Sequence, residues 1–395
     1  MAIPERPKIH PFLDAGPVGL LSEHYVVWDQ LRPHGGKVLV TTRELRCLQL
    51  FDGARTLREI QTDVMRRLGG ELVTVESLQA LAGRLDEAGF LDGPVRPPSC
   101  LGSYPAEPRK LRRLLDELFA APGGAGVPAE PRPDDSLRAA LVPHIDYARG
   151  GPAYTWAFRE VYERTTASLF VILGTSHYSQ YRFILTRKHF RTPLGVVPTD
   201  QEFIDKLVAH YGDSLFDDEL YAHTPEHSIE LEVVFLQYLY DGKRPIRIVP
   251  LLVGSFHDCI ADGELPGEKD DIRRMVAALR AAEAATPEPV CYLISGDLAH
   301  IGPHFGDRDR LSRAALTHSE KQDRAVLRRA EGAAADEFYQ AVAEESDARR
   351  ICGLSPTWTV LAAAQPSRGR ALNYAQYVQP DQNLSVSFAS VAFYR

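Results

Sequence analysis

The sequence predicts an α/β fold, a mostly parallel sheet flanked by helices, preceded by a small winged-helix-like α+β domain. From residue 137 onward, continuous apolar runs of strand length alternate with segments of helical periodicity, as expected for strands buried on both faces. Before residue 95, two strand-like runs are followed by three short helical runs. At 395 residues the chain is long enough for two domains. We therefore divide it into an N-terminal domain (1–95), a linker (96–136) and a large domain (137–395).

The N-terminal domain begins with an arm and continues as a compact module. Residues 1–20 are proline-rich without periodicity, so we expect an extended arm. Residues 23–31 and 38–41 predict strands. Three helices follow, and the second begins with a Thr-x-x-Glu capping box at Thr56 and Glu59. In the linker, residues 108–119 predict a basic amphipathic helix with its leucines on one face.

The sequence of the large domain predicts alternating strands and helices. Its apolar runs predict strands at residues 139–143, 169–174, 183–186, 246–253, 290–295, 372–379 and 384–394, and its periodic segments predict helices at 154–162, 200–210, 228–240, 272–285 and 322–348. Three strands are followed at once by polar groups: His144, His177, and Asp297 with His300. Ligands of open α/β sheets bind at the carboxyl ends of strands, so we expect these side chains to form one site.

Composition excludes several classes of protein. The formal net charge of −8 disfavours nucleic acid as a partner. No apolar run approaches the roughly 18 residues of a membrane span, and no apolar signal core follows the first residues, so we expect neither a membrane nor export. The five cysteines are odd in number and form no CxxC pair, which favours a reducing cytoplasm over a disulfide framework.

Eight short motifs of the large domain occur in the order seen in the Memo family. They are residues 143–147 (PHIDY), 173–177 (LGTSH), 192–195 (TPLG), 226–230 (EHSIE), 249–254 (VPLLVG), 295–300 (SGDLAH), 351–353 (ICG) and 385–387 (SVS). The chain thus resembles Memo proteins, which are similar in fold to the non-haem iron class III extradiol dioxygenases. The resemblance implies a mononuclear iron or copper site with ligands His144, His177 and Cys352, and with His300 nearby. The usual Ala-Gly after the first histidine is Ile145-Asp146 here, and the second motif continues Ser-His-Tyr instead of Ser-His-His.

The residues of this implied site suggest its chemistry. Imidazole suits iron, copper and zinc, and we expect Fe²⁺ first, with copper or zinc as alternatives. Cys352 opens a helix, so we expect a lowered thiol pKa. His300 is a candidate general acid/base, and Asp297 a candidate carboxylate orienting it or a ligand. His227 is a third candidate catalytic residue, although the carboxylates of the same motif could simply hold it at a helix start.

We also predict the positions of four further histidines and of two residues that follow His144. Asp146 and Tyr147 are expected to line the pocket. A surface position is expected for His223, His257, His304 and His318.

The N-terminal domain carries a second resemblance. Residues 39–41, 50–53, 56–60 and 85–91 resemble the PqqD-like peptide-recognition domains, which implies docking of a peptide or protein partner beside the strands. A winged helix that only packs on the large domain is the alternative.

Two functions stay open. The first is a Memo-like, metal-dependent redox enzyme or oxygenase acting on a peptide or protein. The second is a non-enzymatic protein that binds a peptide or a metal in the same cleft. A hydrolase pairing Cys352 with His177 or His300 ranks lower, because two histidines and a thiolate suit a metal better and no G-x-S-x-G elbow is present.

Overall fold

The computed structural model describes residues 4–19, 23–32, 35–67, 72–134, 136–381 and 383–395. The chain divides into two compact units. The first runs up to Leu101 and includes Lys188–Arg191, and the second contains Gly102–Arg187 and Thr192–Arg395. Each unit has its own hydrophobic core.

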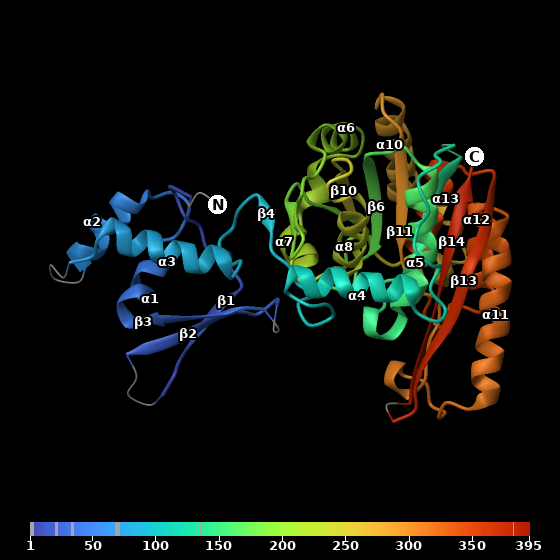
Figure 1. Ribbon diagram of the computed structural model, residues 1–395, viewed down its shortest axis with the longest axis horizontal. Coiled ribbons are helices and arrows are strands. Elements are labelled where there is room, and N and C mark those ends of the chain that lie inside the picture. Colours follow the sequence, from blue (N-terminus) through green and yellow to red (C-terminus); the bar gives the residue numbers. More distant parts are fainter. Residues whose placement is uncertain (1–3, 20–22, 33–34, 68–71, 135, 382) are drawn as a thin grey trace. The chain divides into compact units, whose positions relative to one another are not determined.

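The first unit contains a three-stranded antiparallel sheet (Figure 1). Strands β2 (His24–Asp29) and β3 (Lys37–Thr41) were expected. The extended arm expected before residue 20 contains strand β1 (Leu13–Pro17), which pairs along its whole length with β2, a pairing that the sequence did not predict. Its side chains are partly or fully exposed, so the strand forms through main-chain pairing. The sequence therefore lacks the alternating apolar pattern from which a strand could be predicted.

Three helices complete the core of this unit, as the apolar periodicity predicts. Thr41 caps the first with a reciprocal contact to Glu44, and Thr56 and Glu59 make the expected capping contacts at the start of the second. The unit also pairs β4 (Val95–Arg96) with the start of β8 (His189–Thr192). The helices are α1 (Thr42–Leu48), α2 (Leu57–Arg67) and α3 (Val75–Glu87).

The second unit is built on an eight-stranded, mixed sheet, which confirms the predicted α/β fold. Its order is β12-β14-β5-β11-β6-β10-β7, with β13 paired to β14. The four central strands β5, β11, β6 and β10 are mutually parallel, and the outer strands are antiparallel. The strands are β5 (Leu137–Val142), β6 (Leu169–Thr175), β7 (Phe183–Leu185), β10 (Arg247–Val253), β11 (Val290–Ser295), β12 (His300–Ile301), β13 (Arg368–Gln379) and β14 (Leu384–Tyr394).

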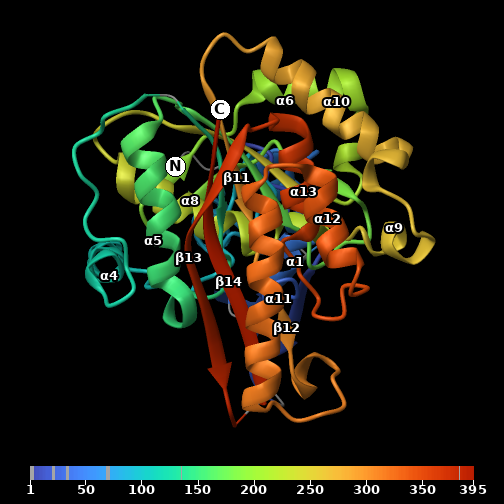
Figure 2. The same ribbon diagram turned by 90° about the vertical axis from the view of Figure 1, so that its right-hand side faces the viewer.

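Helices cover both faces of this sheet (Figure 2). The apolar side chains of β6 and β11 are buried along their whole length, because each strand faces helices on both sides. One face packs against α5 (Tyr147–Arg164) and α8 (Ser228–Tyr240), and α4 (Pro108–Ala120) packs against these two helices. The other packs against α6 (Gln201–Tyr211), α10 (Asp270–Ala284), α11 (Arg313–Glu331), α12 (Ala335–Ala343) and α13 (Leu354–Ala364).

Helix α4 forms where the linker sequence predicts a basic amphipathic helix. Leu111 and Leu115 are fully buried, and the ring of Phe119 stacks on that of Tyr238 in α8. Two arginines of this helix form ion pairs: Arg112 pairs with Asp241 and Arg113 with Glu117. This part of the predicted linker therefore packs into the second unit through its leucine face. Within the described ranges, no helix is long and apolar enough to cross a membrane.

Candidate metal centre

Three predicted site residues meet at the carboxyl edge of the central strands. Strand β11 lies between β5 and β6, with Ser295 opposite both Val142 and Gly174. His144, Asp297 and His177 each stand two residues beyond the ends of β5, β11 and β6. Because these ends lie in register, three segments far apart in sequence come together, as the position of polar groups after buried strands predicts.

Two helix starts bring the other site residues to this edge from opposite faces of the sheet. Helix α8 places Glu226 and His227 just before its first residue, and Cys352 comes two residues before α13. Glycine permits both approaches. A Cβ on Gly174 would lie 2.6 Å from the Ser228 hydroxyl oxygen, and one on Gly296 would lie 2.4 Å from the Cα of Gly353.

His144, His177 and His227 form a compact cluster. Each offers a ring nitrogen, and these three atoms lie within 4.8 Å of one another. The rings of His177 and His227 stack with centroids 4.8 Å apart, and each lies edge-on to His144 at 5.1 Å. His144 is buried, whereas His177 and His227 are about one-third exposed, so the cluster opens to solvent on one side.

The Nδ1 atoms of all three rings are held by neighbouring groups. Glu226 is buried, and its Oε1 lies 3.0 Å from Nδ1 of His177 and 3.2 Å from Nδ1 of His227. The Ser295 hydroxyl donates to the Ser228 carbonyl at 2.6 Å, so its oxygen can accept the Nδ1 proton of His144 at 3.3 Å. With Nδ1 engaged, each ring is left to present Nε2 as its free ligand atom.

Electrostatics sets the charge of the cluster. Burial lowers the pKa of His144 well below its ordinary value, and the facing His177 and His227 lower it further. Burial also opposes ionisation of Glu226, but attraction to His177 and hydrogen bonds from both histidines lower its pKa well below the ordinary range. For His227, hydrogen bonding and attraction to Glu226 overcome burial and raise the pKa. A neutral His144 is the form that binds a metal.

Cys352 lies against the cluster at His144. Its Sγ is 3.2 Å from His144 Nε2 and accepts the main-chain N–H of Asp297, also at 3.2 Å. The expectation of a lowered thiol pKa is wrong for the metal-free protein. Burial and the charge of Asp297 raise the pKa of Cys352 well above its ordinary value, against the smaller opposing effect of the Asp297 N–H. A metal would therefore bind this sulfur with loss of a proton.

Asp297 and His300 stand beside the cluster. The carboxylate of Asp297 accepts the His144 main-chain N–H at 3.0 Å, and its second oxygen lies 3.9 Å from His144 Nε2. Burial raises the Asp297 pKa to about 7. Burial lowers the His300 pKa to about 4, and its Nδ1 lies within 3.1 Å of the Leu298 and Arg350 carbonyls. His300 is thus neutral near pH 7, with its proton on Nδ1.

The remaining predicted residues take different positions. Tyr147 is buried and donates to the Leu231 carbonyl, while Asp146 is half-buried and accepts from Ser103 at 2.8 Å. The expected surface position is wrong for His223, which is buried with Nε2 3.1 Å from the Ile184 carbonyl. The surface position is confirmed for His257, His304 and His318.

Glu226 was expected only as one of the carboxylates that could hold His227, which it does, and Ser295 was given no role although it lies in a quoted motif. The signals were an acid directly before His227 and a hydroxyl at the last position of a buried strand. Neither is distinctive without the fold, since only the strand order shows that Glu226 reaches back to His177.

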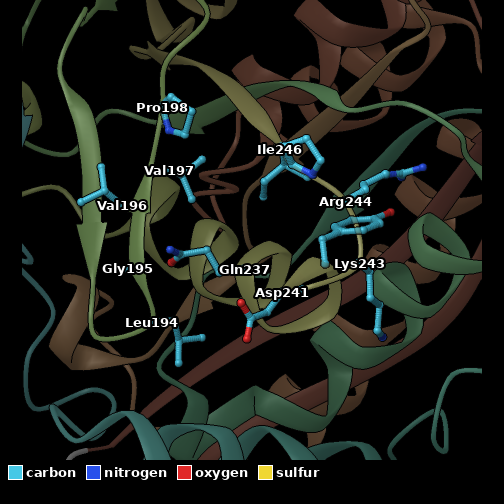
Figure 3. Close-up of a pocket in the computed structure, with 13 residues that line it drawn as sticks. Leu194, Gly195, Val196, Val197, Pro198, Gln237, Asp241, Lys243, Arg244 and Ile246 are labelled. Carbon is cyan, nitrogen blue, oxygen red and sulfur yellow. The ribbon is translucent and has the colours of Figure 1, made fainter.

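A cavity of about 550 Å³ lies elsewhere in the second unit, between strand β9 (Gly195–Val197) and the end of α8 (Figure 3). Its two cations are already engaged. Lys243 donates to the Tyr162 hydroxyl at 2.9 Å, and the Arg244 guanidinium lies 4.4 Å from the centre of the Tyr240 ring. The lining holds neither histidine nor cysteine, which separates it from the histidine cluster.

The fold and the cluster together define an α/β protein with a candidate metal centre at the carboxyl edge of its parallel strands. A family model described as Memo-like protein matches residues 96–392. The chain therefore belongs to the Memo-like family, which confirms the resemblance of the large domain. The match includes α4 and the rest of the segment from residue 96.

Curated relatives agree with this assignment. A MEMO1 family protein of Methanopyrus kandleri is 31% identical over 309 residues, covering 76% of this chain and 99% of the relative. One of Sulfolobus acidocaldarius is 30% identical over 69% of this chain and 88% of the relative. One of Aquifex aeolicus is 25% identical over 98% of this chain and all of the relative, so its likeness extends through the N-terminal unit.

Proposed function

We propose that this Memo-like protein is a metal-dependent redox enzyme or oxygenase. The cluster of three ring nitrogens within 4.8 Å, opening to solvent on one side, carries the proposal. His144 and His177 are its ligands, Cys352 is the predicted sulfur ligand, and His227 is an additional nitrogen donor. Iron is the expected metal, with copper or zinc as alternatives, because imidazole and thiolate serve all three.

The donor atoms fit such a metal. Nitrogen and sulfur atoms bound at about 2.1 and 2.3 Å to one ion lie about 3.1–3.6 Å apart. Cys352 Sγ and His144 Nε2 are 3.2 Å apart. The Nδ1 contacts to Glu226 and Ser295 leave Nε2 as the ligand atom of each ring, which supports binding of a metal by these histidines.

Iron or copper held here would supply one-electron chemistry and a position for dioxygen, and the surrounding residues would manage protons. In the metal-free protein the Asp297 pKa of about 7 lets this carboxyl hold or release a proton at neutral pH, and its Oδ2 lies 3.9 Å from His144 Nε2. His300 is neutral, and because its Nδ1 proton faces two carbonyls, its Nε2 can accept a proton from a bound substrate. These two residues are the proposed catalytic acid and base.

The N-terminal unit supports a peptide or protein as substrate or partner. Its antiparallel sheet and three helices match the elements expected of a PqqD-like domain, and β1 forms one edge of that sheet. A sheet edge can accept an added peptide strand. We place the protein in the cytoplasm, in keeping with its cysteine pattern.

Oxygen consumption tests the proposal. Protein loaded anaerobically with Fe²⁺ and mixed with ascorbate and air-saturated buffer should consume dioxygen faster than protein loaded with Zn²⁺, which has no redox chemistry. A His300→Gln variant should bind iron normally and consume dioxygen more slowly. Bound iron with no consumption above the zinc control would instead make this a metal-binding protein.

A further inference from the structure

We infer that Glu226 is the positioning residue of the histidine cluster, fixing the proton of both His177 and His227 on Nδ1. The inference rests on the proposed metal centre and adds a residue that contacts no metal in it. Glu226 joins the loop after β6 to the start of α8, the two segments that supply these histidines.

The contacts of Glu226 leave little freedom to either ring. Besides the two Nδ1 atoms, its carboxylate accepts the main-chain N–H groups of His177 at 2.9 Å, His227 at 2.9 Å and Ser228 at 3.0 Å. Each histidine is therefore held at both its main chain and its ring by the same carboxylate. Glu226 is 2% exposed, so water does not compete for these bonds.

The chemistry of a carboxylate decides the tautomer. An ionised carboxylate only accepts hydrogen bonds, so a neutral imidazole whose Nδ1 faces it must carry its proton there. The Nε2 atom of each ring then carries a lone pair instead of a proton, and it is the ring nitrogen that does not face Glu226. A glutamine at this position would offer one acceptor oxygen and one NH₂ donor. At the Oε1 position the NH₂ would face both Nδ1 atoms, and at the Oε2 position it would face the main-chain N–H and Nδ1 of His177. His177 therefore faces a donor in either placement, so its ring can carry the proton on Nε2, where it blocks a metal.

The matched control is Glu230, which lies in the first turn of α8. Glu230 is also fully buried, but its carboxylate accepts the Tyr104 hydroxyl instead of a ligand histidine. Glu230→Gln makes the same chemical change four residues further along the chain, at a carboxylate whose charge acts on His227 less strongly than that of Glu226. Glu226→Asp keeps a carboxylate and should preserve the tautomer, which separates loss of positioning from loss of the fold.

Two measurements test the inference. In metal-free protein with ¹⁵N-labelled histidine, the pH is raised from about 8.5 until the His227 signal no longer changes, because the His227 pKa lies above the ordinary imidazole value. His177 and His227 should then both show the Nδ1–H tautomer. At least one should change to Nε2–H in Glu226→Gln, and neither should change in Glu230→Gln or Glu226→Asp. Competition with a chelator for Zn²⁺ should show an affinity loss of about 10- to 100-fold in Glu226→Gln alone.

The outcomes separate the two proposals. Unchanged tautomers and zinc affinity in a folded Glu226→Gln variant would overturn the positioning role. Equal losses in Glu230→Gln would also overturn it, since they would report a general effect of buried carboxylates on α8. A wild-type protein that binds no zinc or iron would overturn the metal centre, while the tautomer measurement, which needs no metal, would still decide the role of Glu226.

Discussion

At the scale of single residues, the site combines groups whose environments push their proton affinities apart. Burial raises the pKa of Asp297 to about 7 and lowers the pKa of His300 to about 4. Cys352 keeps its proton in the metal-free protein because burial and Asp297 both disfavour the thiolate. The charge of this site is therefore set by burial, and a bound cation would reverse it.

Asp297 should make the metal-free protein less stable as the pH rises. The unfolded chain releases the Asp297 proton near 3.8, while the folded protein holds it to about 7. Between these values the folded state binds more protons, so its free energy of unfolding falls by about 4 kcal/mol. Urea unfolding of wild type and Asp297→Asn at several pH values in this range measures the effect. An equal pH dependence in both proteins would contradict it.

Cys352 should bind metal as a thiolate. Co²⁺-loaded wild type is expected to show a sulfur-to-cobalt absorption band in the near ultraviolet. The band should strengthen with rising pH, because the raised thiol pKa makes proton loss the limiting step. Cys352→Ser should lack the band. A band-free wild-type spectrum with cobalt bound would leave the three histidines as the ligands and remove sulfur from the set.

At the scale of elements, the site depends on how closely two helix starts approach the sheet edge. The main chains of Gly296 and Gly353 pack against each other, and the Gly353 N–H donates to the Asp297 carbonyl at 2.9 Å. This contact joins the loop after β11 to the segment that carries Cys352. Glycines are visible at these positions in the sequence. The reason that glycine is required is a contact between distant segments, which no local sequence pattern reveals.

A methyl group at Gly296 should separate these two segments. Gly296→Ala places a Cβ 2.4 Å from the Cα of Gly353, so the main chain must shift, at a cost of about 1–3 kcal/mol in unfolding free energy. Zinc affinity should fall as Cys352 moves from His144. Gly93→Ala is the control, because its added methyl meets open space. Unchanged stability and affinity in Gly296→Ala would show that the contact is unimportant.

At the scale of the whole molecule, sequence predicts much of the fold because the buried strands are apolar along their whole length. The positions of His144, His177 and Asp297 follow from the same pattern. The link from Glu226 to His177, the raised Cys352 pKa and strand β1 could not be predicted, because each depends on packing or main-chain pairing between distant segments. The functional assignment of the N-terminal unit stays a prediction.

The two units should respond differently to metal. Each has its own core, so calorimetry should resolve two unfolding transitions. Zinc at about 100 times its Kd should stabilise only the unit with the histidine cluster, by about 2.7 kcal/mol. His144→Ala should abolish the shift. A shift of both transitions in wild type would contradict the placement of the metal site in the second unit.

Metal content tests the central claim most directly. Protein purified anaerobically, loaded with Fe²⁺ and desalted should retain about one iron per chain, as expected for a mononuclear centre. His144→Ala and His177→Ala should retain little, whereas His210→Ala, which removes an exposed histidine on α6, should match wild type. If His144→Ala and His177→Ala hold as much iron as wild type, the metal is bound elsewhere and the proposed centre is wrong.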